Sequence, residues 1–155
     1  MNRTIIDLMD DKIHLLEHYN DITSQIISED IDGVGDLIDE RQRILTNMDG
    51  ISVSVKQYVN EQSIERMDKI NALLRFEEIG DLNDEMLELQ EKIKRIQSLR
   101  EEIKANDKKA FARIKRERDE LKEKLENAGK GKLISDYFSQ SAVDVTKGSK
   151  LNVSN

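Results

Sequence analysis

The stretch from Asp81 to Asn127 contains neither glycine nor proline, and this feature most restricts the fold. The chain has no proline anywhere, so no residue removes a helix hydrogen bond or clashes with the preceding turn. Apolar residues recur along one side of the stretch at near-heptad spacing: Met86, Leu89, Ile93, Ile96, Ile103, Ala110, Ile114, Leu121 and Leu125. The pattern predicts one charged helix, about 65–70 Å long if unbroken. A break at Asn106–Asp107 is the alternative.

A small domain cannot cover a helix of that length. Part of it must therefore face a partner, which could be a second copy, a client protein or the other helices of an extended bundle. Its later half, residues 101–126, has the thinnest apolar stripe and is the part we expect to project.

Three further helices are expected before this one. Residues 3–27 show apolar side chains at three- and four-residue spacing, and a short helix follows over about 36–48, with Asp36 as a possible N-cap. The sequence ISVSV (51–55) alternates like a strand but has no second strand to pair with, so it is interpreted as the lead-in to a third helix. That helix is expected to end near Phe76, with a phase break around residues 60–63. Asp81 can cap the last helix after Gly80.

The predicted fold class is therefore all-α, an antiparallel bundle or hairpin of about four helices. Hydrophobic and charged residues each make up 37% of the 155 residues and aromatic residues only 4%, which indicates a thin Ile/Leu core. Residues 129–155 differ, with three glycines and many Ser, Asn and Thr, and predict a flexible tail behind a helical domain of residues 1–128. Four lysines against two aspartates give this tail +2, so the −7 of the whole chain leaves −9 for the helical domain.

Charge and composition also exclude several classes of function. An acidic surface repels nucleic acid and anionic membranes, so the basic stretch KKAFARIKRER (108–118) is interpreted as the solvated face of a charge-rich helix. No apolar run has the length of a membrane span, and no signal peptide precedes the first helix, so a cytoplasmic protein is expected. The absence of cysteine excludes disulfides, thiolate metal sites and a cysteine nucleophile.

Two motifs suggest metal chemistry and are both rejected. HLLEH (14–18) fits the H-x-x-E-H zinc pattern, but helical phase places His14 nearly opposite the apolar face, with Glu17 and His18 well off it. SEDIDGVGDLID (28–39) resembles a calcium-binding EF-hand loop. Ser28 stands at its first position and Asp39 where a bidentate Glu is needed, so an acidic turn between helices is preferred. We therefore expect no metal, no cofactor and no enzymatic activity.

The stretch IISEDIDGVGDLIDERQRILTNMDGI (26–51) resembles the first helical turn-around of flagellar export chaperones of the FlgN/FliT type. In that family a few acidic residues precede an L-x-x-L/I-x-x-E-R-x-x-I/L-L segment. The match here is carried by Leu37, Ile38, Glu40, Arg41, Ile44 and Leu45. The rest is similar in layout: a middle helix, a long charged last helix with K-R-I-x-x-L (94–99), and a small-residue tail with an aromatic.

The resemblance implies a chaperone of the flagellar type III secretion system. Such a protein binds the helical C-terminal region of a hook-associated or filament-cap protein, blocks its premature assembly and delivers it to the export apparatus. The candidate client-binding residues are those of the apolar stripe on the last helix: Ile93, Ile96, Ile103, Ala110, Ile114, Leu121 and Leu125. Tyr137 and Phe138 are candidates for docking at the export gate, or for packing back on the bundle. The alternative is a structural, homodimeric coiled-coil module of another system.

Overall fold

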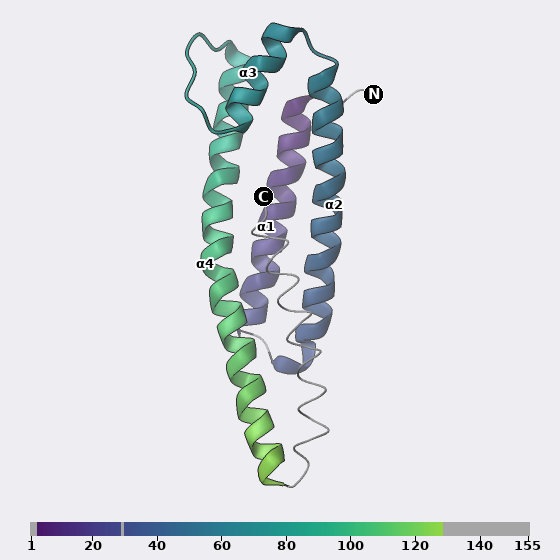
Figure 1. Cartoon of the computed structure of the whole chain (residues 1–155), viewed down its shortest axis with the longest axis vertical. Helices are drawn as coiled ribbons and strands as arrows, with labels where there is room; N and C mark the ends of the chain where they lie inside the picture. Colours follow the sequence, from purple (N-terminus) through teal and green to yellow (C-terminus); the bar gives the residue numbers. More distant parts are fainter. Residues whose placement is uncertain (1–2, 29, 129–155) are drawn as a thin grey trace. The chain divides into compact units, whose positions relative to one another are not determined.

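The structure, a computed structural model, describes residues 3–28 and 30–128. In this part of the chain every regular element is a helix, so the all-α prediction is confirmed. The elements are α1 (Ile5–Ser28), the 3-10 turn η1 (Ile31–Gly33), α2 (Val34–Asn60), α3 (Ile64–Leu74) and α4 (Asp84–Asn127) (Figure 1).

The helices build two compact units. Among the described residues, unit 1 comprises 3–19 and 46–102, and unit 2 comprises 20–28, 30–45 and 103–128. Each of α1, α2 and α4 contributes one part to each unit, whereas α3 belongs to unit 1 alone. The predicted boundary between a helical domain and a flexible tail lies where the described residues end, and it stays a prediction.

The core of unit 1 is formed by apolar side chains from all four helices. They are Ile5, Leu8, Met9, Leu16 and Tyr19 of α1, Ile51 and Val59 of α2, Ile70 and Leu73 of α3, and Met86, Leu89, Ile93, Ile96 and Leu99 of α4. At its edge, the Lys92 ammonium lies 2.6 Å from a carboxylate oxygen of Asp10 and connects α4 to α1. This thin core of mainly Ile, Leu and Met matches the composition.

Arg66 holds α3 in place within unit 1. Its guanidinium forms an ion pair with Glu85 of α4 and donates a hydrogen bond of 3.0 Å to the hydroxyl of Tyr58 on α2. Ser63 caps the helix, because its hydroxyl accepts a hydrogen bond from the backbone N–H of Arg66. One arginine thereby connects three helices at the end of the unit where α3 begins.

In unit 2, α1 and α4 run in the same direction. Asn20 of α1 is hydrogen-bonded to Asn106 of α4, and Ile26, further along α1, to Arg113, further along α4. The part of α2 in this unit runs the opposite way (Figure 1). The antiparallel pairs are therefore α1 with α2 and α2 with α4.

The structure corrects the expected helix boundaries. α2 begins at Val34, two residues before the predicted cap Asp36, and continues through Gly50 and the ISVSV segment to Asn60. The predicted break after residue 48 was wrong, since Met48, Ile51, Val55 and Val59 continue one stripe at three- and four-residue spacing. The phase break around residues 60–63 is confirmed as the gap between α2 and α3.

α4 is one uninterrupted helix of 44 residues, so the alternative break at Asn106–Asp107 is absent. Its N-cap lies two residues later than expected. The side chain of Asn83, not that of Asp81, accepts a hydrogen bond from the backbone N–H of Met86 at 2.8 Å and serves as the cap. Asp81 itself lies in the preceding loop with a φ of 54°.

Candidate interaction surface

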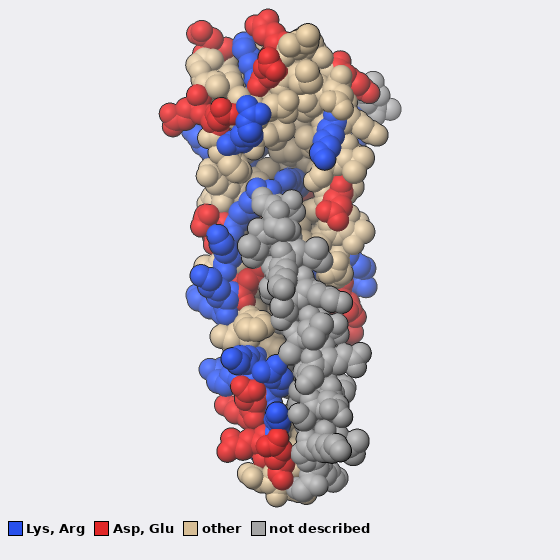
Figure 2. Space-filling view, viewed as in Figure 1, with Lys and Arg blue, Asp and Glu red and all other residues tan. Residues whose placement is uncertain are grey.

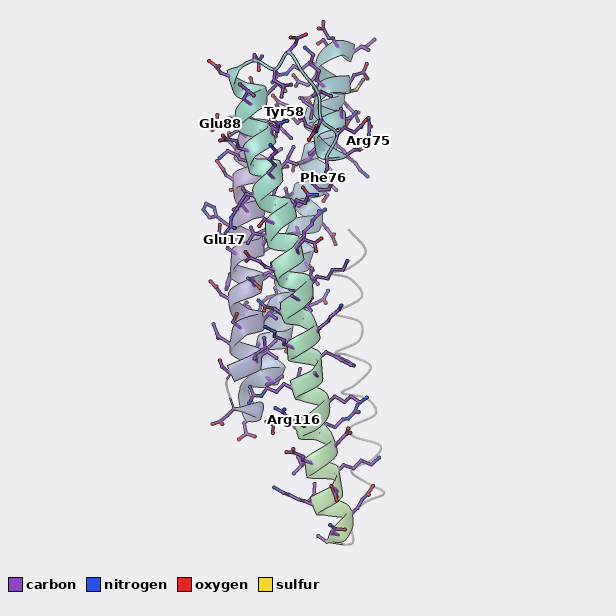
Figure 3. All side chains as sticks on the ribbon, turned by 90° about the vertical axis from the view of Figure 1, so that its left-hand side faces the viewer. Glu17, Tyr58, Arg75, Phe76, Glu88 and Arg116 are labelled. Atoms are coloured by element: carbon purple, nitrogen blue, oxygen red, sulfur yellow. The ribbon has the colours of Figure 1, made fainter. Side chains whose placement is uncertain are left out.

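The last turns of α4 extend past the end of α1 in unit 2. Arg113 donates a hydrogen bond of 2.8 Å to the carbonyl oxygen of Ile26, close to the end of α1 at Ser28. α4 nevertheless continues to Asn127. Figure 3 shows Arg116 near the level where α1 stops and several further turns of α4 beyond it. These turns have no neighbouring helix in the described part of unit 2.

Apolar side chains continue along this extension without being buried. Ala110 is the last fully buried residue of α4, with 3% of its surface exposed. Beyond it, Ile114 and Leu125 are half-buried, and Phe111 and Leu121 are 40% and 43% exposed. We refer to Phe111, Ile114, Leu121 and Leu125 as the apolar end of α4. Soluble helices normally bury such a stripe, so the apolar end is a candidate binding surface.

The seven candidate client-binding residues divide into two groups. Ile93, Ile96, Ile103 and Ala110 are buried in the units, with at most 5% of their surface exposed. They face the other helices of the bundle, and a client would reach them only if the bundle opened. Ile114, Leu121 and Leu125 belong to the apolar end and are accessible on the folded chain.

A buried polar cluster lies just before the apolar end. Nη1 of Arg41 lies 2.8 Å from Oδ1 of Asp107 and 3.1 Å from the Thr23 hydroxyl, so the cluster joins α1, α2 and α4. Sequence reasoning missed it, although a signal was present: Asp107 falls on the same helical face as Ile103 and Ala110. A charged residue on a buried stripe indicates a partner of opposite charge.

The outer faces of α4 carry both signs of charge. Exposed lysines and arginines gather over the middle of the helix, with acidic side chains nearer its two ends (Figure 2). Pairs at i,i+4 lie along it: Lys92 with Glu88 at 3.9 Å, Arg113 with Glu117 at 3.6 Å, and Lys122 with Glu126 at 3.9 Å. Such pairs, at least partly open to solvent, support the helix weakly and leave the long-range field acidic.

Unit 1 has exposed apolar side chains that the sequence analysis did not single out as a surface. They are Val53, Ile64, Phe76 and Leu87, with Ile64 74% exposed. Phe76 adopts a left-handed backbone conformation with a φ of 64°, which is uncommon for an aromatic residue. Figure 3 shows it beside Arg75, directly after α3.

The two metal-like motifs lie on α1 and in the turn between α1 and α2. His14, Glu17 and His18 are exposed on α1, and the acidic turn forms η1 followed by the first turn of α2. Across residues 3–28 and 30–128, no three His, Asp or Glu residues gather in a way that could hold a metal ion. In the same ranges, no helix is both long enough and apolar enough to cross a membrane. Tyr137 and Phe138 lie outside the described residues.

No protein-family model, no curated protein and no solved structure matches this chain.

Proposed function

We propose that this protein is a cytoplasmic flagellar export chaperone of the FlgN/FliT type. In this proposal it binds the helical C-terminal region of a hook-associated or filament-cap protein, blocks its premature assembly and delivers it to the export apparatus. It acts by binding alone, without catalysis, metal or cofactor.

The apolar end of α4 carries the proposal. An amphipathic helix of a client can pack beside α4 and cover Ile114, Leu121 and Leu125, because the last turns of α4 extend past α1 and have no neighbouring helix among the described residues of unit 2. The charged side chains around the stripe, among them the Lys122–Glu126 pair, would form the polar rim of such an interface. The acidic surface keeps the chaperone apart from nucleic acid while it carries its client.

A second candidate function is a homodimeric coiled-coil module. It is favoured by the spacing of Ile114, Leu121 and Leu125, whose seven- and four-residue steps suit pairing of two α4 helices. The two functions predict different oligomeric states for the purified protein in the absence of a client.

Size-exclusion chromatography with light scattering tests both. The full chain is measured alone and with the C-terminal segments of flagellar hook-associated and cap proteins. A chaperone is expected to run as a monomer and to form a one-to-one complex with one segment. A salt-insensitive dimer that binds no segment would reject the chaperone and support the coiled-coil module.

Matched variants locate the interface on α4. Leu121→Gln with Leu125→Gln removes the apolar side chains but keeps good helix formers. Glu123→Gln with Lys124→Gln changes exposed positions of the same turns and serves as the control. The first variant should lose the client complex and the control should keep it. Equal loss in both would place the client site elsewhere.

A further inference from the structure

Lys12 occupies a core position of α1. It stands three and four residues from Leu8, Met9 and Leu16, all of which are at most 3% exposed. Residues at this spacing share one face of a helix. The face that packs the core of unit 1 therefore includes a lysine, and its side chain is only half-buried.

Arg100 likewise lies on the core-facing side of its helix, α4. It follows Ile96 and Leu99, which are 3% and 2% exposed, and it is half-buried. α1 and α4 are neighbours in unit 1, as the ion pair of Asp10 with Lys92 shows. Two neighbouring helices thus each place a cation on the stripe that otherwise forms the core.

The two cations affect each other. Burial, and then the positive charge of Arg100, lower the pKa of Lys12 from 10.5 to about 8. Burial also lowers the pKa of Arg100 from its usual value. Two like charges in a partly dehydrated position repel each other. They therefore destabilise the folded chain as long as no anion is bound between them.

The two acidic residues that precede Lys12 in the chain are already paired. Asp10 is bound by Lys92, and Asp11 by Arg3. Glu101, next to Arg100, is exposed, as are Asp49 and Lys56 of α2. Within residues 3–28 and 30–128, neither Lys12 nor Arg100 has an ion pair or a hydrogen bond to its side chain. The site therefore has two positive charges and lacks an anion.

We propose that Lys12 and Arg100 together bind one oxyanion, a carboxylate or a phosphate, at the α1–α4 face of unit 1. The planar guanidinium of Arg100 suits two oxygens of such a group, and the ammonium of Lys12 can reach a third or share one of them. The hydrocarbon stems of both side chains and their apolar neighbours exclude water from one side, which strengthens the interaction. The site is separate from the apolar end of α4 and does not depend on the function proposed for it.

The full-length protein can be titrated with inorganic phosphate, with acetate and with an acetylated Asp-Asp-Asp peptide. Sodium chloride keeps the ionic strength constant, and an equal chloride series measures nonspecific screening. Binding should raise the melting temperature above the chloride series and raise the pKa of Lys12, followed by NMR of its 13Cε atom. Phosphate as the strongest ligand would identify a phosphate site. Acetate and the peptide acting at least as strongly would identify a site for protein carboxylates.

Variants separate this site from general screening by salt. Lys12→Met and Arg100→Met should each weaken binding about 10–100-fold, since each removes a charged hydrogen bond. Lys12→Arg keeps the charge and should retain binding. Lys94→Met changes an exposed lysine of the same region and should bind as the unaltered chain does. No response beyond chloride, or an unchanged response in Lys12→Met, would overturn the proposal.

Discussion

Arg41 of α2 and Asp107 of α4 form a buried ion pair in unit 2, with 2.8 Å between Nη1 and Oδ1 and with 6% and 8% of their side chains exposed. Thr23 of α1 accepts a further hydrogen bond from the same guanidinium nitrogen. Removing two charges from water costs about as much free energy as their attraction returns, so such a pair adds little net stability. Its main effect is to specify which residues of the helices face each other. It sets the register of three helices whose surrounding contacts are mostly interchangeable aliphatic side chains.

Removing one partner of this pair should destabilise the protein strongly. Asp107→Leu leaves the Arg41 charge buried without its carboxylate, which should lower the free energy of unfolding by about 3–5 kcal/mol. The double variant Arg41→Met with Asp107→Leu should recover most of that loss. Urea unfolding of the full chain, followed by circular dichroism, measures both.

A second ion pair provides the control. Arg66 and Glu85 are 27% and 41% exposed, so Glu85→Gln should cost less than about 1 kcal/mol. If Asp107→Leu cost no more than Glu85→Gln, the buried pair would not have the role assigned to it.

Lys12→Met should stabilise the fold. In the folded chain the Lys12 pKa is lowered to about 8, whereas in the unfolded chain it has the usual value of 10.5. The charged lysine therefore opposes folding below pH 8, by at most about 3 kcal/mol. Replacing it with an apolar side chain of similar length should recover part of this free energy at pH 7.

The same shift gives a pH dependence with a definite sign. Between about pH 8 and 10.5 the unfolded chain binds more protons at Lys12 than the folded chain, so the stability of the unaltered protein rises with pH. The advantage of Lys12→Met should therefore shrink over this window. Melting temperatures at pH 7 and pH 10 check it, with exposed Lys94→Met as the control. An advantage that grew with pH would contradict the assignment.

Gly50→Ala should also stabilise the protein. Gly50 lies inside α2, and a Cβ added there would meet no atom within 4 Å. Alanine costs less backbone entropy than glycine in a helix, so the free energy of unfolding should rise by about 0.5–1 kcal/mol. Thermal unfolding of the full chain measures it. Gly80→Ala, outside the helices, should have a smaller effect, and destabilisation by Gly50→Ala would argue that α2 is interrupted there.

Gly50 also illustrates how far the sequence predicts the fold. Periodicity predicted four helical segments, but a glycine followed by an alternating ISVSV suggested an interruption. The stripe through Ile51 and Val59 outweighed that local signal, because packing of an apolar face overrides propensity. Periodicity likewise placed Ile93, Ile96 and Leu121 on one face of α4. It could not tell which of them other helices cover, because that depends on where α1 ends relative to α4.

Substitutions at the buried and at the exposed positions of the α4 stripe should have different effects on stability. Ile96 is 3% exposed in unit 1, so Ile96→Ala should leave a cavity and cost about 2–5 kcal/mol of unfolding free energy. Leu121 is 43% exposed, so Leu121→Ala should change stability by less than about 0.5 kcal/mol. Urea unfolding of both variants under identical conditions gives the comparison.

Client binding should be affected by Leu121→Ala and not by Ile96→Ala, the reverse of the order expected for stability. If the apolar end binds a client helix, Leu121→Ala should weaken the complex while the free chain keeps its melting temperature. Ile96→Ala should lower the melting temperature but bind normally wherever it remains folded, since Ile96 is covered by the bundle. Calorimetric titration well below the melting temperature of both variants checks this. Weaker binding by folded Ile96→Ala, with none by Leu121→Ala, would mean that the client enters an opened bundle and contacts its interior.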